Sequence, residues 1–109
     1  MENNYIELQD EQNTVYVNAK TRHLFRQMLN ETCEDILLGK DRIKYGECLY
    51  QIKRDVFESL FNQWVTKCQD AGYMYIKNDN SSEKYLAWSN DLNDVQRALK
   101  GMEVLKEIL

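Results

Sequence analysis

Catalysis requires a nucleophile, a base or a set of metal ligands at a recognisable spacing, and this chain has few candidates. Its single histidine, His23, has no serine or cysteine nearby in a known nucleophile motif, and its four glycines form neither a phosphate loop nor a dinucleotide-binding turn. Asp91 with Asp94, and Glu34 with Asp35, are possible carboxylate pairs, but helix capping and solvation already explain such residues. We therefore expect a protein that is not an enzyme and that uses no cofactor and no metal ion.

Thiol chemistry is not expected either. The chain has three cysteines, Cys33, Cys48 and Cys68, which is an odd number without C-x-x-C spacing. Each falls on the apolar stripe of a segment that the sequence predicts to be helical. They are best interpreted as reduced residues of the core.

The tyrosines have the pattern that most resembles a binding site. Five of the seven fall on alternate positions of strand-like runs, always opposite the aliphatic residues: Tyr5, Tyr16, Tyr73, Tyr75 and Tyr85. Successive side chains of a strand point to opposite faces, so an aliphatic core would leave the tyrosines on an outer aromatic face. A rigid ring with a hydroxyl group suits recognition of another protein. Tyrosine also simply favours strands, and a helix could cover this face, so both alternatives stay open.

A basic cluster marks the start of the first predicted helix. Lys20, Arg22, His23 and Arg26 lie at the helix end whose dipole favours anions. Free backbone amides beside several cations can bind a phosphate or the acidic side chains of a partner. We predict an auxiliary contact for an acidic ligand here, with neutralisation by acids of the preceding hairpin as the alternative.

Length and composition are those of one compact domain spanning residues 1–109, with 43% hydrophobic residues in 13.0 kDa. The net charge is -4, although residues 14–54 carry eight bases against five acids. Overall acidity argues against affinity that rests on phosphate contacts. No apolar run approaches the roughly 20 residues of a membrane helix, and the acidic N-terminus does not resemble a signal peptide. We expect a cytoplasmic protein that does not bind membranes.

Periodicity predicts the elements that would position these residues. Alternation with period two predicts strands over 5–9, 14–18, 73–77 and 84–89, which would form two hairpins. Helical spacing predicts one helix over 20–38 with Gly39 as its C-terminal cap, another continuous from about 45 to 68, and a third over 92–109. A break near Asp55 is the alternative for the middle helix, with 43–52 as a short helix or strand.

These elements predict an α+β fold of order ββααββα. Two hairpins are too small to be stable alone, so we expect them to join in one mostly antiparallel sheet with helices packed on one face.

The function predicted from these features is a small, non-catalytic protein-binding module that binds a partner or its own copy. Its size and mild acidity suit a regulator or inhibitor that occupies a partner's surface, of the kind carried by phages and mobile elements. The alternative is a winged-helix nucleic-acid-binding protein that would use helix 55–71 and hairpin 73–89. Outer residues Asn62, Gln63, Thr66 and Lys67 are of the kinds that contact bases or phosphates, but three bases against five acids make segment 55–89 negative.

Overall fold

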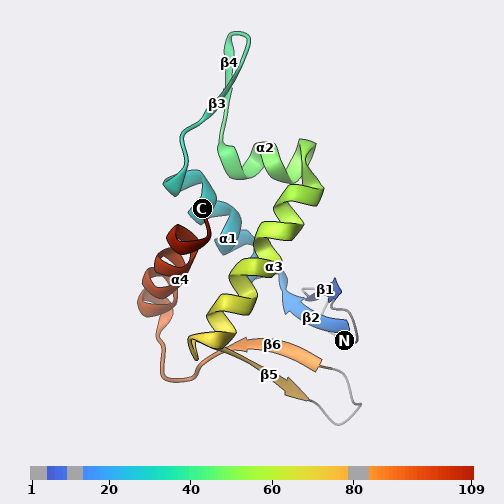
Figure 1. Ribbon diagram of the computed structural model, residues 1–109, viewed down its shortest axis with the longest axis vertical. Helices are drawn as coiled ribbons and strands as arrows, with labels where there is room; N and C mark the ends of the chain where they lie inside the picture. Colours follow the sequence, from blue (N-terminus) through green and yellow to red (C-terminus); the bar gives the residue numbers. More distant parts are fainter. Residues whose placement is uncertain (1–4, 10–13, 79–83) are drawn as a thin grey trace.

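The two hairpins near the ends of the chain join in one four-stranded sheet. The computed structural model describes residues 5–9, 14–78 and 84–109, with side chains for 15–77 and 84–109. Strand β1 (Tyr5–Gln9) pairs antiparallel with β2 (Thr14–Asn18), and β5 (Met74–Asn78) pairs antiparallel with β6 (Lys84–Trp88). The hairpins meet where β2 and β6 run parallel, which gives the order β1-β2-β6-β5 (Figure 1). The predicted polar connections, 10–13 and 79–83, lie outside the described residues.

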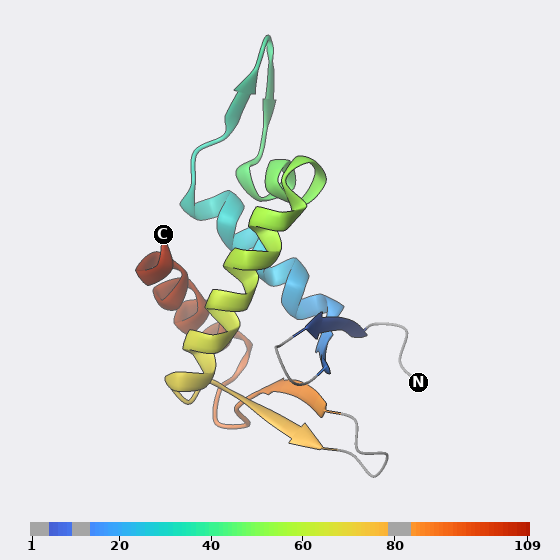
Figure 2. The ribbon, with the colours of Figure 1, turned by 45° about the vertical axis from the view of Figure 1, so that its right-hand side comes forward.

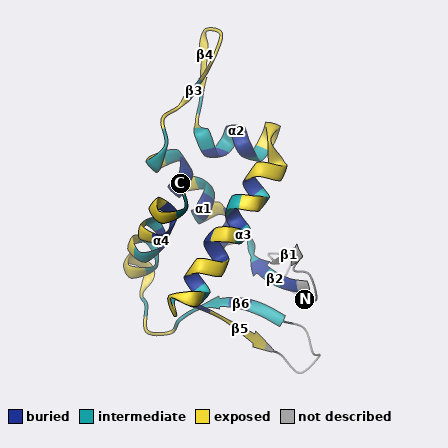
Figure 3. Cartoon of the chain, viewed as in Figure 1, coloured by how far each residue is buried: buried dark blue, intermediate teal, exposed yellow. Residues whose placement is uncertain are grey.

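The aliphatic side of this sheet faces the helices. Val15 and Val17 on β2, Met74 on β5 and Leu86 on β6 are all buried in the main hydrophobic core. Since side chains alternate between the faces of a strand, the tyrosines of these strands lie on the opposite side. Figure 3 shows the buried positions mainly along the helices and on β2.

Three helices supply most of the remaining core: α1 (Ala19–Thr32), α3 (Arg54–Asp70) and α4 (Asp94–Ile108). The start of α1 is capped by the Asn18 side chain, which accepts a hydrogen bond from the Lys20 amide at 2.8 Å. Asn93 and Gln96 form a reciprocal capping box at the start of α4. Helix α4 therefore begins at Asp94, two residues after the start of the helix predicted over 92–109.

Trp64 of α3 contacts α1, the sheet and α4. Its ring lies 5.0 Å from Phe25 of α1 and 5.8 Å from Trp88 of β6, measured between centroids. Its Nε1 donates a hydrogen bond of 2.9 Å to the carbonyl oxygen of Gly101 on α4. A Cβ at Gly101 would lie 2.7 Å from Cε of Met28 and 3.0 Å from Cζ2 of Trp64, so a larger residue there would require these side chains to move.

The helix predicted over residues 20–38 is wrong in its second part. Helix α1 ends at Thr32, and Cys33 is already extended. Strands β3 (Ile36–Leu38) and β4 (Asp41–Ile43) then form a hairpin, here called the arm, that projects beyond the helices (Figures 1 and 2). Two acids, Glu34 and Asp35, would oppose the helix dipole at a C-terminus, and a hairpin removes that conflict. Gly39 has φ of 65°, which serves the turn of the arm and not a helix cap.

The continuous helix from 45 to 68 is also wrong. Helix α2 (Tyr45–Ile52) and α3 are separated at Lys53, whose φ of -124° and ψ of 59° are not helical. The chain changes direction there, so Ile52 and Val56 leave the predicted apolar stripe and are 56% and 40% exposed. Helix α2 instead packs closely on α1 at Gly46. A Cβ at this position would lie 2.4 Å from the Arg26 carbonyl oxygen, so the close approach requires glycine.

The observed order is therefore ββαββααββα. The mixed helix and strand character is confirmed. The predicted order is wrong, because it lacks the arm and the separation of α2 from α3, and the arm adds a third hairpin outside the four-stranded sheet. In the described part of the chain, no helix combines the length and apolar character needed to cross a membrane.

The cysteines are free thiols that differ in exposure. Cys48 and Cys68 are buried, while Cys33 is half-buried at the end of α1. Burial raises the pKa of Cys68 to about 12 and raises the pKa of Cys33 by the same cause. Both thiols are thereby kept in the protonated, less nucleophilic form at neutral pH.

One arginine is part of the core. Arg22 of α1 is 6% exposed, forms an ion pair with Glu58 of α3, and lies over the Phe61 ring with its guanidinium carbon 4.9 Å from the centroid. Its Nε and Nη1 atoms have no hydrogen-bond partner among the described residues. The carboxylate of Glu58 therefore stabilises the positive charge of Arg22, which is costly to bury without a partner.

We expect Glu58→Gln to lower the free energy of unfolding by about 2–3 kcal/mol, because it leaves the Arg22 charge buried without its partner. The loss is smaller than for a fully buried pair since Glu58 is 34% exposed. Urea unfolding followed by circular dichroism measures this difference. The control is Glu103→Gln, whose surface pair with Lys100 at 3.8 Å should contribute less than about 0.5 kcal/mol. Equal losses in the two variants would contradict the role assigned to Glu58.

Candidate functional site

Three of the five predicted tyrosines lie together on the outer face of the sheet. Tyr16 of β2 and Tyr85 of β6 are direct cross-strand neighbours, with ring centroids 5.6 Å apart and planes tilted by 34°. Tyr75 of β5 is 40% exposed. Helix α4 makes its main contacts with α3 and α1 instead of covering this face (Figure 1). The structure therefore leaves an aromatic surface in contact with solvent.

The other two tyrosines do not extend this surface. Tyr73 precedes β5 and is half-buried against the core, and the Lys100 ammonium group lies 5.8 Å from its ring centroid. Its carbonyl oxygen accepts a hydrogen bond of 2.8 Å from the Ser89 amide. Tyr73 thus belongs to the joint between sheet and α4. The side chain of Tyr5 lies outside the described residues.

The predicted basic cluster is divided between two environments. Arg22 is buried against α3, as described above. Arg26 faces α2, where its Nε lies 3.0 Å from Oε1 of Glu47 and its guanidinium carbon lies 4.5 Å from the Tyr50 ring centroid. Both arginines therefore join helices within the molecule. Lys20 and His23 are exposed.

A cleft of about 500 Å³ lies where the sheet meets the first turns of α1 and α4. Its wall contains Lys20 of the predicted basic cluster and Tyr75 of the outer aromatic face. This face, formed by Tyr16, Tyr75 and Tyr85, is called the tyrosine surface below. The lining residues are Asn18, Lys20, Thr21, Leu24, Tyr75, Lys77, Leu86, Ala87, Trp88, Asn90, Asp94 and Arg97.

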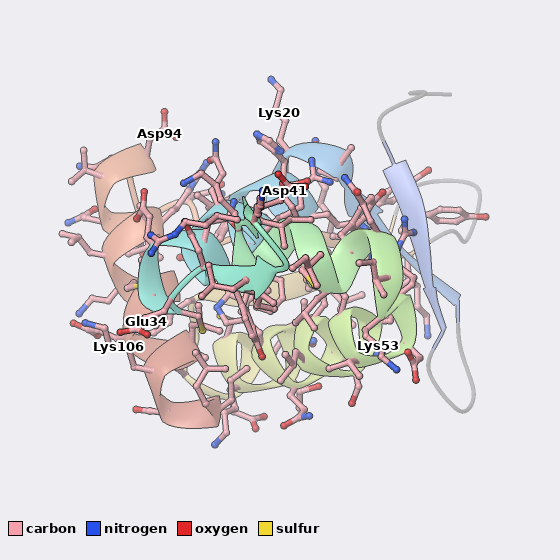
Figure 4. All side chains as sticks on the ribbon, turned by 90° about the horizontal axis from the view of Figure 1, so that it is seen from above. Lys20, Glu34, Asp41, Lys53, Asp94 and Lys106 are labelled. Atoms are coloured by element: carbon pink, nitrogen blue, oxygen red, sulfur yellow. The ribbon has the colours of Figure 1, made fainter. Side chains whose placement is uncertain are left out.

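The cleft carries net positive charge in a protein that is acidic overall. Lys20, Lys77 and Arg97 line it together with a single acid, Asp94. Figure 4 shows Lys20 and Asp94 extending outward on the same side of the molecule. Asp94 is 99% exposed and its Oδ1 is 3.5 Å from Nη1 of Arg97, a pair that solvent screens strongly. An anionic side chain entering the cleft would find three cations beside an aromatic ring.

No pattern in the sequence indicates this cleft directly. Lys77 was visible on the same strand face as Tyr75, but Arg97 and Lys20 come from helices far away in the chain. Only the packing of α1 and α4 beside the β5–β6 hairpin brings them together. Of the four residues predicted to contact an acidic ligand, Lys20 lines the cleft. Lys77 and Arg97 line it in addition.

Comparison with known proteins adds no further assignment. A scan of protein-family models, a search of curated proteins and a search of solved structures each found no match. Within residues 5–9, 14–78 and 84–109, no group of three or more His, Cys, Asp or Glu side chains is placed to hold a metal ion. The interpretation of the cleft rests on its own geometry and charge.

The two tryptophans allow a test of the cleft's charge. Trp88 lines the cleft and is half-buried, whereas Trp64 is fully buried. We expect the ratio of the iodide to the caesium Stern–Volmer slope for Trp88, with each slope divided by that of free N-acetyltryptophanamide, to exceed one, because net positive charge concentrates anions. Trp88→Phe should remove this excess, and higher ionic strength should narrow it. Equal normalised slopes for the two ions in the unmodified protein would contradict a positive cleft.

Proposed function

We propose that this protein is a small, non-catalytic module that binds a partner protein through the tyrosine surface and the adjacent basic cleft. It acts as a regulator or inhibitor by occupying the partner's surface, in the manner of small proteins of phages and mobile elements, and does so in the cytoplasm. The partner segment carries acidic side chains, which enter the cleft, next to apolar groups, which contact the rings of Tyr16, Tyr75 and Tyr85.

The observation that carries this proposal is that an exposed tyrosine and three cations line the same cleft. Tyr75 lines the cleft with Lys77, Lys20 and Arg97. Tyrosine and arginine are over-represented among residues that dominate binding energy, because they bury a large rigid area and still form hydrogen bonds. Acidic side chains match the excess positive charge and would associate faster at low salt.

Tyr75→Ser is the first test of this function. The partner is first captured with the unmodified protein from an extract of the cells that produce it, and its affinity is then measured by titration calorimetry. We expect Tyr75→Ser to weaken binding at least tenfold, since loss of a central aromatic contact costs on the order of 2 kcal/mol. The melting temperature should stay nearly constant because Tyr75 is already 40% exposed.

Matched controls separate this site from the rest of the surface. Leu99→Ser removes a side chain that is 60% exposed on α4 and should leave affinity unchanged. Lys77→Glu should slow association, whereas Lys106→Glu, which reverses an exposed lysine near the end of α4, should not. A partner that binds all four variants equally would refute the proposed site.

A winged-helix nucleic-acid-binding function is the second candidate, favoured by the position of α3. This helix begins after a break at Lys53 and leads directly into the β5–β6 hairpin, as a recognition helix leads into a wing. Gln63, Thr66 and Lys67 are exposed on its outer side, and Asn62 is half-buried. The excess of acids in segment 55–89 places this candidate second.

A gel-shift titration with duplex DNA at low salt decides this candidate. If α3 and the hairpin contact DNA, Lys67→Glu combined with Lys84→Glu should abolish the shift, because each reversal replaces a cation near the phosphates by an anion. Lys106→Glu serves as the control and should bind as the unmodified protein does. No shift with the unmodified protein removes the candidate.

A further inference from the structure

The arm carries leucines that no core covers. It projects at the end of the molecule opposite the four-stranded sheet, and Figure 3 shows it mostly exposed (Figures 1 and 3). Leu37 is 64% exposed and Leu38 is 49% exposed. Because neighbouring residues of a strand point to opposite faces, both faces of the arm display an apolar side chain. An isolated two-stranded hairpin is only marginally stable in water, so a covering partner would stabilise it.

Strand β3 also has an open edge, and the register shows which backbone groups face it. β3 pairs with β4 alone, with Leu37 opposite Arg42 and Leu38 opposite Asp41. The pair that closes a two-residue turn is hydrogen-bonded, and bonded pairs alternate with non-bonded pairs along an antiparallel ladder. Leu37 and Arg42 are therefore a non-bonded pair, and the N–H and C=O of Leu37 point away from β4.

The charges that flank this edge are opposite at its two ends. Glu34 and Asp35 precede Ile36, and Lys40 follows Gly39. Glu34 and Lys40 are both exposed. Glu34 lies two residues before β3, and Lys40 lies in the turn that joins β3 to β4. An edge with acids before it, apolar residues along it and a base in the turn after it is complementary to itself when two copies run antiparallel.

We propose that the open edge of β3 docks the same edge of a second copy of this chain. A two-fold axis at Leu37 lets the two Leu37 residues exchange both backbone hydrogen bonds. The same axis sets Ile36 opposite Leu38 of the second copy and brings Glu34 near the turn of the second copy, which carries Lys40. The arms then form one four-stranded sheet, and the cleft of each copy remains free.

The charge pattern selects a second copy over an unrelated strand. Any extended chain can bond to an open edge, but only an antiparallel copy centred at Leu37 aligns both apolar pairs and both opposite charges at once. Because β3 has three residues, the buried area falls below the roughly 1,200 Å² of a stable complex, so the dimer exchanges rapidly with monomer.

A charge-swap series measured by sedimentation velocity over a range of concentrations tests the pairing. Glu34→Lys and Lys40→Glu should each weaken self-association at least tenfold, because each brings like charges near one another twice. The double variant should restore it. Within one chain these residues are about 15–20 Å apart along the extended arm, so restoration reports contact between copies.

Two proline variants test which edge is used. Leu37→Pro removes an N–H that faces the open edge of β3 and should abolish the dimer, while Arg42→Pro removes the equivalent outward N–H of β4 and should leave it intact. Circular dichroism controls for folding. A monomeric unmodified protein at millimolar concentration, a double charge swap that does not restore association, or a dimer lost only in Arg42→Pro would overturn the proposal. Tyr75→Ser should dimerise normally, which separates this surface from the proposed partner site.

Discussion

The contacts of one tryptophan fix the positions of α1, the sheet and α4 relative to α3. Trp64 is fully buried on α3 and reaches α1 through Phe25, the sheet through Trp88 and α4 through the Gly101 carbonyl. An indole has one N–H to satisfy, and a buried N–H without an acceptor is costly, so the hydrogen bond fixes α4 at one distance from α3. The missing side chain at Gly101 makes that distance short. The positions of α1, β6 and α4, whose ends line the cleft, follow from this arrangement.

The cleft shows how an acidic chain can present a positive surface. Its cations come from the first turn of α1, from β5 and from α4, while many of the acids lie elsewhere on the surface. Two arginines that the sequence grouped with Lys20 serve other contacts, since Arg22 pairs with Glu58 and Arg26 faces Glu47. Burying a guanidinium group requires such partners, because a charge taken out of water is stable only when it is compensated. Local charge near a helix end is therefore a poor guide to which cations remain available to a ligand.

The arm and the cleft lie at opposite ends of a molecule whose principal extents are 52 × 25 × 24 Å (Figure 1). The arm adds no residue to the main core, and the tyrosine surface lies on the far side of the sheet from it. An elongated molecule with a separate surface at each end can join its own copy at one end and a different partner at the other. The proposed dimer would bring two of the proposed partner sites into one assembly and raise the effective concentration of each for a divalent target.

The sequence by itself determined the positions of the four strands of the main sheet, the side of that sheet that faces the core, and the helical character of the segments around Phe25, Trp64 and Val104. Periods of two and 3.6 residues are local properties of the chain. It identified Tyr16, Tyr75 and Tyr85 as face residues for the same reason. Tertiary structure decided that Tyr73 turns into the joint with α4, that 36–43 becomes an arm, that α2 and α3 separate at Lys53, and that Lys20, Lys77 and Arg97 share a cleft. These features depend on contacts between residues distant in the chain, and a short sequence window with comparable propensities for two conformations cannot choose between them.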